Sequence, residues 1–194
     1  MDEVGMGCLA GPVVVCAVGF TNHFYNKIHK KYFKLRDSKL LSARDREKFA
    51  GELVKEKDLV YAIAQCFPTT IDKLNIYQAS RLAMKRAIVA LRLAQGDQNY
   101  LKQIILVDGK TKINGLKIEQ MSIVKGDRKI FAIACASIIA KVHRDGMMAR
   151  YAKKYPEYGF EKHKGYGTRF HKAQLASFGP CEIHRRSFRL AIDG

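Results

Sequence analysis

Short apolar runs rich in β-branched residues alternate along the chain with longer stretches of helical spacing, and this alternation constrains the fold more than any other feature. Strands are predicted for residues 12–20, 59–67, 104–109 and 116–124. Helices are predicted for residues 43–57 (with Ser42 as N-cap), 68–94 and 129–154, whereas residues 21–41 are predicted to be irregular. Strands interleaved with helices indicate an α/β protein with a mixed central β-sheet flanked by helices.

Two adjacent carboxylates, Asp2 and Glu3, stand before a glycine-rich segment that ends at Gly11 and leads into the first predicted strand. Glycines let the backbone pass close to a ligand and permit positive φ. A carboxylate pair beside such a segment suits a divalent cation that carries a phosphate, because Mg²⁺ takes few protein ligands and leaves room for substrate oxygens. A solvated acidic N-terminus is the alternative that these residues leave open. We also expect Asp2 to lie at a fraying chain end.

Further acids follow two of the apolar strands. Asp108 comes after Leu106-Val107, and Asp127 comes after Ile123-Val124, directly before the long helix. Functional side chains of α/β folds gather beyond the strand ends, and the start of a helix favours a carboxylate. Asp145 competes with Asp127, but it lies about 27 Å further along the same helix at a rise of about 1.5 Å per residue. The helix geometry therefore favours Asp127.

The charge of the chain points to a polyanionic partner. Lys and Arg number 35 against 18 Asp and Glu, which gives a formal net charge of +17. This excess favours nucleic acid first and an anionic membrane surface second. The five cysteines form no CxxC pair and indicate reduced thiols in a cytoplasmic protein. Acids instead of Lys or Arg before the first apolar run argue against an export signal, and no run is long enough to span a bilayer.

Six motifs occur in an order that closely resembles bacterial ribonuclease HII, over residues 2 to about 188. They are Asp2-Glu3-x-Gly5-x-Gly7 with Gly11-Pro12, Asp37-Ser38-Lys39, Val107-Asp108-Gly109, Lys125-Gly126-Asp127, Ala136-Ser137-Ile138-Ile139-Ala140-Lys141-Val142-x-Arg144-Asp145, and Lys164-Gly165-Tyr166-Gly167-Thr168. Each motif alone is weak, but six in register are specific.

The resemblance implies an RNase H-like catalytic domain over residues 1–155 and a small basic C-terminal extension of helices and loops over residues 156–194, which packs on the domain and contacts substrate. It implies cleavage of the RNA strand of RNA–DNA hybrids and cleavage 5′ to ribonucleotides embedded in duplex DNA. The catalytic, metal-binding carboxylates of the family carry over onto Asp2, Glu3, Asp108 and Asp127. They would hold two Mg²⁺ or Mn²⁺ ions with substrate bound, which is a chemistry suited to phosphodiester hydrolysis.

Substrate-binding residues follow from the same resemblance and from the basic side chains. In the family, the backbone of a glycine turn and a tyrosine surround the ribose, whose 2′-OH distinguishes RNA from DNA. These positions correspond to Gly5, Met6, Gly7 and Tyr166, although a tyrosine that merely packs on the sheet remains an alternative. Basic residues in the matching loops and the tail are candidate phosphate contacts, while most cations of so basic a chain are only solvated. These candidates are Lys39, Lys164, Arg185 and Arg186.

Two alternatives stay open. His163, His171, Cys181 and His184 gather in the tail, but only the Cys-x2-His spacing resembles a zinc pair, so packing is favoured. The second alternative concerns function: a catalytically weak or inactive module of the same fold would bind RNA–DNA hybrids without cutting them. We expect a protein without membrane contact that acts as a monomer.

Overall fold

The computed structural model describes residues 1–28, 30, 41–95 and 103–188. Strands β1 (Asp2–Val4), β2 (Val13–Phe20) and β3 (Leu59–Cys66) form an antiparallel sheet in that order, and β4 (Ile104–Asp108) pairs in parallel with β5 (Glu119–Ile123). The backbone of Met1 joins the two parts. Its nitrogen donates to Leu106 O at 2.7 Å, and its carbonyl accepts from Asp108 N at 3.1 Å. This is the pattern of parallel neighbours, so the predicted mixed sheet is confirmed.

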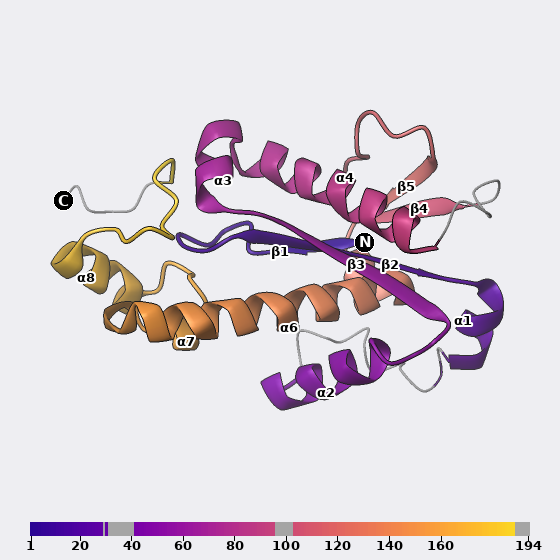
Figure 1. The fold of residues 1–194 in the computed structure, drawn as a ribbon, viewed down its shortest axis with the longest axis horizontal. Helices are drawn as coiled ribbons and strands as arrows, with labels where there is room; N and C mark the ends of the chain where they lie inside the picture. Colours follow the sequence, from indigo (N-terminus) through magenta and orange to yellow (C-terminus); the bar gives the residue numbers. More distant parts are fainter. Residues whose placement is uncertain (29, 31–40, 96–102, 189–194) are drawn as a thin grey trace.

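Helices cover both faces of this sheet (Figure 1). One face carries α3 (Pro68–Leu74) and α4 (Ile76–Gln95), and the other carries α2 (Ala43–Leu53) and the long α6 (Phe131–Lys154). Shorter elements complete the described chain: α1 (Asn22–Ile28), α5 (Gly126–Lys129), the 3-10 helix η3 (Pro156–Tyr158), α7 (Phe160–His163) and α8 (Arg169–Phe178). No described helix has the length and apolar character needed to cross a membrane.

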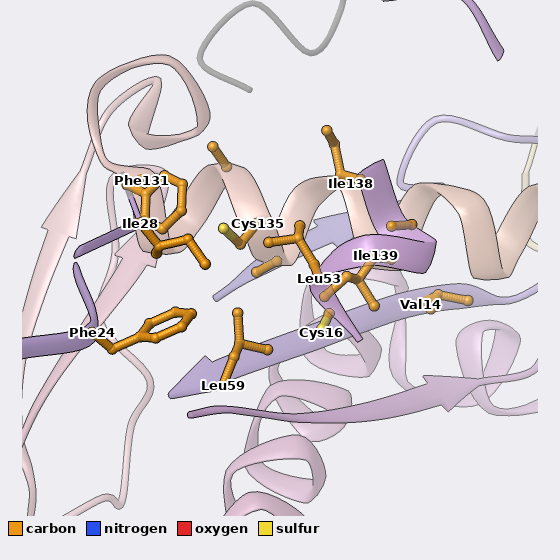
Figure 2. Packing of buried hydrophobic residues seen from close by; sticks show 14 of the residues in the cluster. Val14, Cys16, Phe24, Ile28, Leu53, Leu59, Phe131, Cys135, Ile138 and Ile139 are labelled. Carbon is orange, nitrogen blue, oxygen red and sulfur yellow. The ribbon is translucent and has the colours of Figure 1, made fainter. Parts of the chain in front are cut away.

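A hydrophobic core fills the space between the sheet and α6. Ala134, Ala136 and Ala140 on α6 are fully buried, and these small side chains let the helix approach the sheet closely. Larger side chains from α1, α2 and β3 fill the rest of the layer (Figure 2). A second cluster lies between the sheet and α4. The sheet that contains β1 is thus packed on both of its faces, by α6 on one and by α4 on the other.

Local capping explains where the helices begin and where the sequence-based prediction was wrong. Ser42 Oγ accepts from Asp45 N at 3.1 Å, which confirms the predicted N-cap of α2. The single helix predicted over residues 68–94 is two helices, because Asn75 takes a φ of 66° and its side chain accepts from Gln78 N to start α4. Residues 22–28 form α1 instead of an irregular segment, and Thr21 Oγ1 accepts from Phe24 N at its start.

The first strand is better held than its place near the chain end predicts. Asp2 is only 6% exposed and Met1 only 5% exposed. Main-chain pairing with β2 on one side and with β4 on the other fixes this segment in the middle of the sheet. The expectation of a fraying Asp2 is therefore wrong.

Glycine at position 165 is expected to be essential to the fold, because two costs coincide there. Its φ is +87°, and a Cβ would stand 2.4 Å from Ala10 O. Gly109 has a similar φ of +96° but open space around the missing Cβ. Gly109→Ala should cost about 1–2 kcal/mol from backbone strain alone. Gly165→Ala should cost about 1–3 kcal/mol more for the clash with backbone. Urea unfolding of the matched pair checks this difference, and equal losses would contradict it.

Candidate active site

The four acids singled out from the sequence line one cavity of about 400 Å³. Asp2 and Glu3 come from β1, Asp108 from the end of the neighbouring β4, and Asp127 from the first turn of α5, just after β5. The structure thus brings together side chains from three places in the sequence at one end of the sheet. The hydrogen bonds of Met1 make β1 and β4 adjacent parallel strands, so the acids at these strand positions lie next to one another.

Burial and mutual repulsion shape the electrostatics of the acid pair. Loss of water contact raises the pKa of Asp2 to about 6, with the Asp108 charge adding to the rise and a hydrogen bond from Ser137 opposing it. The pKa of Glu3 is raised to about 7, first by burial and then by the charges of Asp2 and Asp108. Two carboxyl groups with raised pKa values in one cavity favour either a bound proton or a bound cation.

Glu3 has an unsatisfied acceptor. Its Oε2 atom is buried and has no hydrogen-bond partner among the described residues. Such an orphaned carboxylate oxygen is costly unless something else binds it, and a hard divalent cation is the ligand that oxygen donors favour. In the described part of the chain, however, no three Asp, Glu, His or Cys side chains are already arranged to hold a metal ion.

A backbone donor holds Asp108 on another side of the cavity. Gly126 N donates to Asp108 Oδ1 at 2.7 Å, which ties the end of β4 to the start of α5. A Cβ at Gly126 would stand 3.2 Å from the same oxygen and 2.5 Å from Ile133, so glycine is required for this close approach. Asp127 is almost fully buried. Asp145 lies elsewhere on α6, where it pairs with Lys141 at 2.8 Å.

The glycine turn, Gly5-Met6-Gly7, and Tyr166 line the same cavity as the acids. Tyr166 is 44% exposed and belongs to the tyrosine loop, Lys164-Gly165-Tyr166-Gly167. Two main-chain contacts hold the loop beside the glycine turn. Cys8 and Tyr166 form an isolated antiparallel β-bridge, and Leu9 N donates to Gly165 O at 2.8 Å. Two segments that are more than 150 residues apart thus form one wall.

The predicted phosphate contacts fare differently. Arg186 is exposed, and Lys164 Nζ donates to Glu161 O at 2.6 Å. Arg185 is fully buried, with its guanidinium bound to backbone carbonyls, so its assignment as a phosphate contact is corrected. A basic tail gives no signal of which cation faces inward. Lys39 lies outside the described residues.

Sequence reasoning missed three polar residues of the cavity, namely Arg46, Ser137 and Lys141. Ser137 and Lys141 stand one helical turn apart on α6, so a search for polar residues at i, i+4 spacing on its small-residue face would have found them. Arg46 lies on α2 and donates to Leu41 O at 2.5 Å. Its place in the cavity depends on how α2 packs, which no local pattern indicates.

The histidines of the tail form a buried network under the tyrosine loop. His171 Nδ1 lies 2.9 Å from Tyr166 O, and His171 Nε2 lies 3.0 Å from His184 Nε2. His184 Nδ1 accepts from Cys181 N at 2.9 Å, and His163 Nδ1 accepts from Gly165 N at 3.1 Å. Each ring thus uses both nitrogens within the protein. This arrangement matches the packing interpretation of these residues.

Solved structures of known proteins share this architecture. Ribonuclease H2 from Pyrococcus horikoshii OT3 matches with a TM-score of 0.75 over 98% of this chain and 92% of that chain, at 27% identity. Bst-RNase HIII in complex with Mn²⁺ matches with the same score over 97% of this chain and 66% of that chain, at 18% identity. The fold and its acid-lined cavity therefore define a nuclease of the RNase H-like class.

Sequence comparisons give the particular family. The family model described as Ribonuclease HII matches residues 1–191. A curated relative named ribonuclease HII from Pelodictyon phaeoclathratiforme is 44% identical over 98% of this chain and 88% of that protein. A second relative named ribonuclease HII, from Caldicellulosiruptor saccharolyticus, is 46% identical over 97% of this chain and 84% of that protein. The chain belongs to the ribonuclease HII family. It is an endoribonuclease that acts on RNA–DNA hybrids, and the alternative of an inactive binding module is not favoured.

Replacing Glu3 with Gln is expected to stabilise the metal-free protein at alkaline pH. Because the pKa of Glu3 is raised to about 7, the unfolded chain ionises this group first, and stability falls as the pH rises from about 4.5 to 7. The variant cannot ionise and should be more stable by roughly 1–3 kcal/mol at pH 8. Urea unfolding in EDTA measures this, with the exposed Glu47→Gln as control. A less stable Glu3 variant would contradict the prediction.

Acid is expected to weaken the fold through His184. Burial, followed by the neighbouring His171, lowers the pKa of His184 to about 4. The unfolded chain takes up a proton below about pH 6.5 while the folded chain does not, so stability is lost as the pH falls from about 6.5 to 4. Between pH 7 and 5 the parent should lose roughly 1–2 kcal/mol more than His184→Gln, which cannot titrate. Urea unfolding at both pH values compares them, and parallel losses would refute the prediction.

Proposed function

We propose that this endoribonuclease cuts both the RNA strand of RNA–DNA hybrids and the bond 5′ to a ribonucleotide embedded in duplex DNA. Asp2, Glu3, Asp108 and Asp127 are its proposed catalytic residues. The observation that carries the proposal is their convergence on one cavity whose wall is made by the glycine turn and Tyr166. An acidic cluster beside a glycine turn and a tyrosine suits phosphodiester hydrolysis next to a 2′-OH.

The carboxylate oxygens of these acids are suitable ligands for a hard divalent cation. The family is metal-dependent, and we propose two Mg²⁺ or Mn²⁺ ions held by Asp2, Glu3, Asp108 and Asp127 with substrate bound. The orphaned Glu3 Oε2 and the raised pKa values of the acid pair support this proposal, because a cation would satisfy both. When bound, such ions neutralise charge at the scissile phosphate and make water a better nucleophile.

The protein's own residues prepare the cavity for that chemistry. Glu3 N donates to Asp2 Oδ1 at 2.8 Å and Gly126 N donates to Asp108 Oδ1 at 2.7 Å, so one oxygen of each of these two carboxylates is held in place. Ser137 lines the same cavity. Lys141 and Arg46 place cationic side chains in the same cavity. We propose that they contact phosphates flanking the cut, where they would offset the negative charge of the substrate.

Recognition of the ribose is proposed for the opposite wall. The 2′-OH both donates and accepts hydrogen bonds, so a protein can read it with a backbone turn and a phenol. We propose Gly5, Met6, Gly7 and Tyr166 for this role, and the cavity that they share supports the assignment. Uncharged hydrogen-bonding groups of this kind recognise the 2′-OH without contacting the bases, so recognition does not depend on the base sequence.

Outside the cavity, we propose Lys39, Lys164 and Arg186 as phosphate contacts, with the net charge of +17 guiding the duplex to the protein. We also propose that residues 1–155 form the catalytic domain and that residues 156–194 pack on it. Packing of Phe160 and Leu175 against Met148 of α6 supports this division. A cytoplasmic location is supported by five free cysteines, four of them buried. A monomeric state stays a prediction.

A pair of matched variants tests the choice of acids. Asp108→Asn should lower cleavage of a labelled duplex with one ribonucleotide on the order of a hundredfold or more, because it removes charge that stabilises the transition state through the ions. Asp58→Asn removes the same charge at an exposed position that does not line the cavity, and should change the rate less than about threefold. Both are assayed with Mg²⁺ and with Mn²⁺, and EDTA should abolish cleavage. An equal loss of cleavage rate in the two variants, or cleavage in the presence of EDTA, would contradict the proposed site.

A further inference from the structure

Arg185 is a buried cation without an acidic partner. Its side chain is fully buried, although it lies in the basic tail. No described Asp or Glu forms an ion pair with it, and its guanidinium stacks 5.1 Å from the centre of the Phe188 ring. Burial lowers the pKa of Arg185 to about 10, which leaves it charged at neutral pH. A charge kept in the interior without a counter-ion is costly unless its donors are well used.

Those donors bind the glycine turn from behind. Arg185 Nη2 donates to Gly5 O at 2.6 Å, Nη1 donates to Met6 O at 2.9 Å, and Nε donates to Gly11 O at 3.0 Å. Arg185 N also donates to Leu9 O at 2.9 Å. The guanidinium does not line the cavity, whereas the turn does. Arg185 therefore lies on the far side of the turn from the acids.

Peptide geometry then determines which way the turn's amides point. In a planar trans peptide the N–H points opposite to the C=O. Because the Gly5 and Met6 carbonyls point to Arg185, the amides of Met6 and Gly7 in the same two peptides point away from it, toward the cavity. Neither amide donates a hydrogen bond to any other residue in the described part of the chain. Two successive free N–H groups with a positive charge behind them form a donor site for an oxygen ligand.

We propose that Arg185 is a positioning residue for ribonucleotide recognition: it turns two carbonyls away from the cavity and so presents the Met6 and Gly7 amides to the ribose and its phosphate. This inference rests on the proposed function of the glycine turn. Arg185 touches neither substrate nor the four acids in this arrangement. Its removal should therefore affect the choice between ribonucleotide and deoxyribonucleotide more than the rate of the chemical step.

The test compares Arg185→Ala with Leu53→Ala, a fully buried position in the core between the sheet and α2 that loses stability without touching the turn. Cleavage is measured on a long RNA–DNA hybrid and on a duplex with one ribonucleotide. Arg185→Ala should lower kcat/KM on the single ribonucleotide at least about tenfold more than on the hybrid, mainly through KM, because a recognition site loses its aligned donors. Leu53→Ala should lower both equally. Ethylguanidinium, which fills the vacated space, should restore the preference of Arg185→Ala.

Binding separates this inference from the proposed function. In an Asp108→Asn background, affinities are measured for two duplexes that differ only by one 2′-OH. If the background protein binds both equally, the proposed recognition and this inference both fail. If it prefers the ribonucleotide and adding Arg185→Ala leaves that preference unchanged, only this inference fails. A preference that falls toward equality, and returns with ethylguanidinium, supports it.

Discussion

Negative charges that repel one another in a place largely closed to water are the constraint on which this structure depends. Burial is the larger cost of ionising Asp2 and Glu3, and the charge of Asp108 adds to it at both residues, as the charge of Asp2 does at Glu3. Such an arrangement persists only because the surrounding structure leaves the side chains nowhere else to go. Pairing of β1 with strands on both sides, and packing of α6 beneath it, supply that restraint. The fold therefore loses stability at the position where we propose that the catalytic charges lie.

Two buried arginines supply a second restraint, on the loops instead of the strands. Arg144 donates to the carbonyls of Pro12, Ala10 and Lys164, while Arg185 holds the glycine turn. Loops rich in glycine have few side chains of their own to fix them, and their conformational entropy is high. Charged donors aimed at several carbonyls at once can offset that entropy where apolar contacts are scarce. The wall that the glycine turn and the tyrosine loop form is thus held by two arginines that do not line the cavity.

Much of this could be predicted from the sequence, because periodicity and strand ends are local signals. The alternation of strands and helices predicted the mixed sheet. The acidic pair before the glycine-rich segment predicted Asp2 and Glu3, and the acids at strand ends predicted Asp108 and Asp127, all of which line the cavity. The break at Asn75 was missed because its capping hydrogen bond competes with a strong helical pattern. The burial of Arg185 was missed because the composition gives the number of charged residues but not which of their side chains point into the protein. Arg46 reaches the cavity only through packing of α2, which is a tertiary effect without a local sequence pattern.

The histidine network under the tyrosine loop has a consequence for how the protein responds to ionic conditions. Its rings are joined to the loop by uncharged hydrogen bonds in a buried setting, which dissolved ions barely screen. Attraction between exposed lysines or arginines and a nucleic-acid backbone, by contrast, weakens steeply as salt displaces counterions. Under the proposed recognition of the ribose by the glycine turn and Tyr166, affinity for the duplex and discrimination at the ribose rest on physically different forces. Raising the salt concentration is then expected to release the duplex sooner while leaving the preference for a ribose over a deoxyribose unchanged.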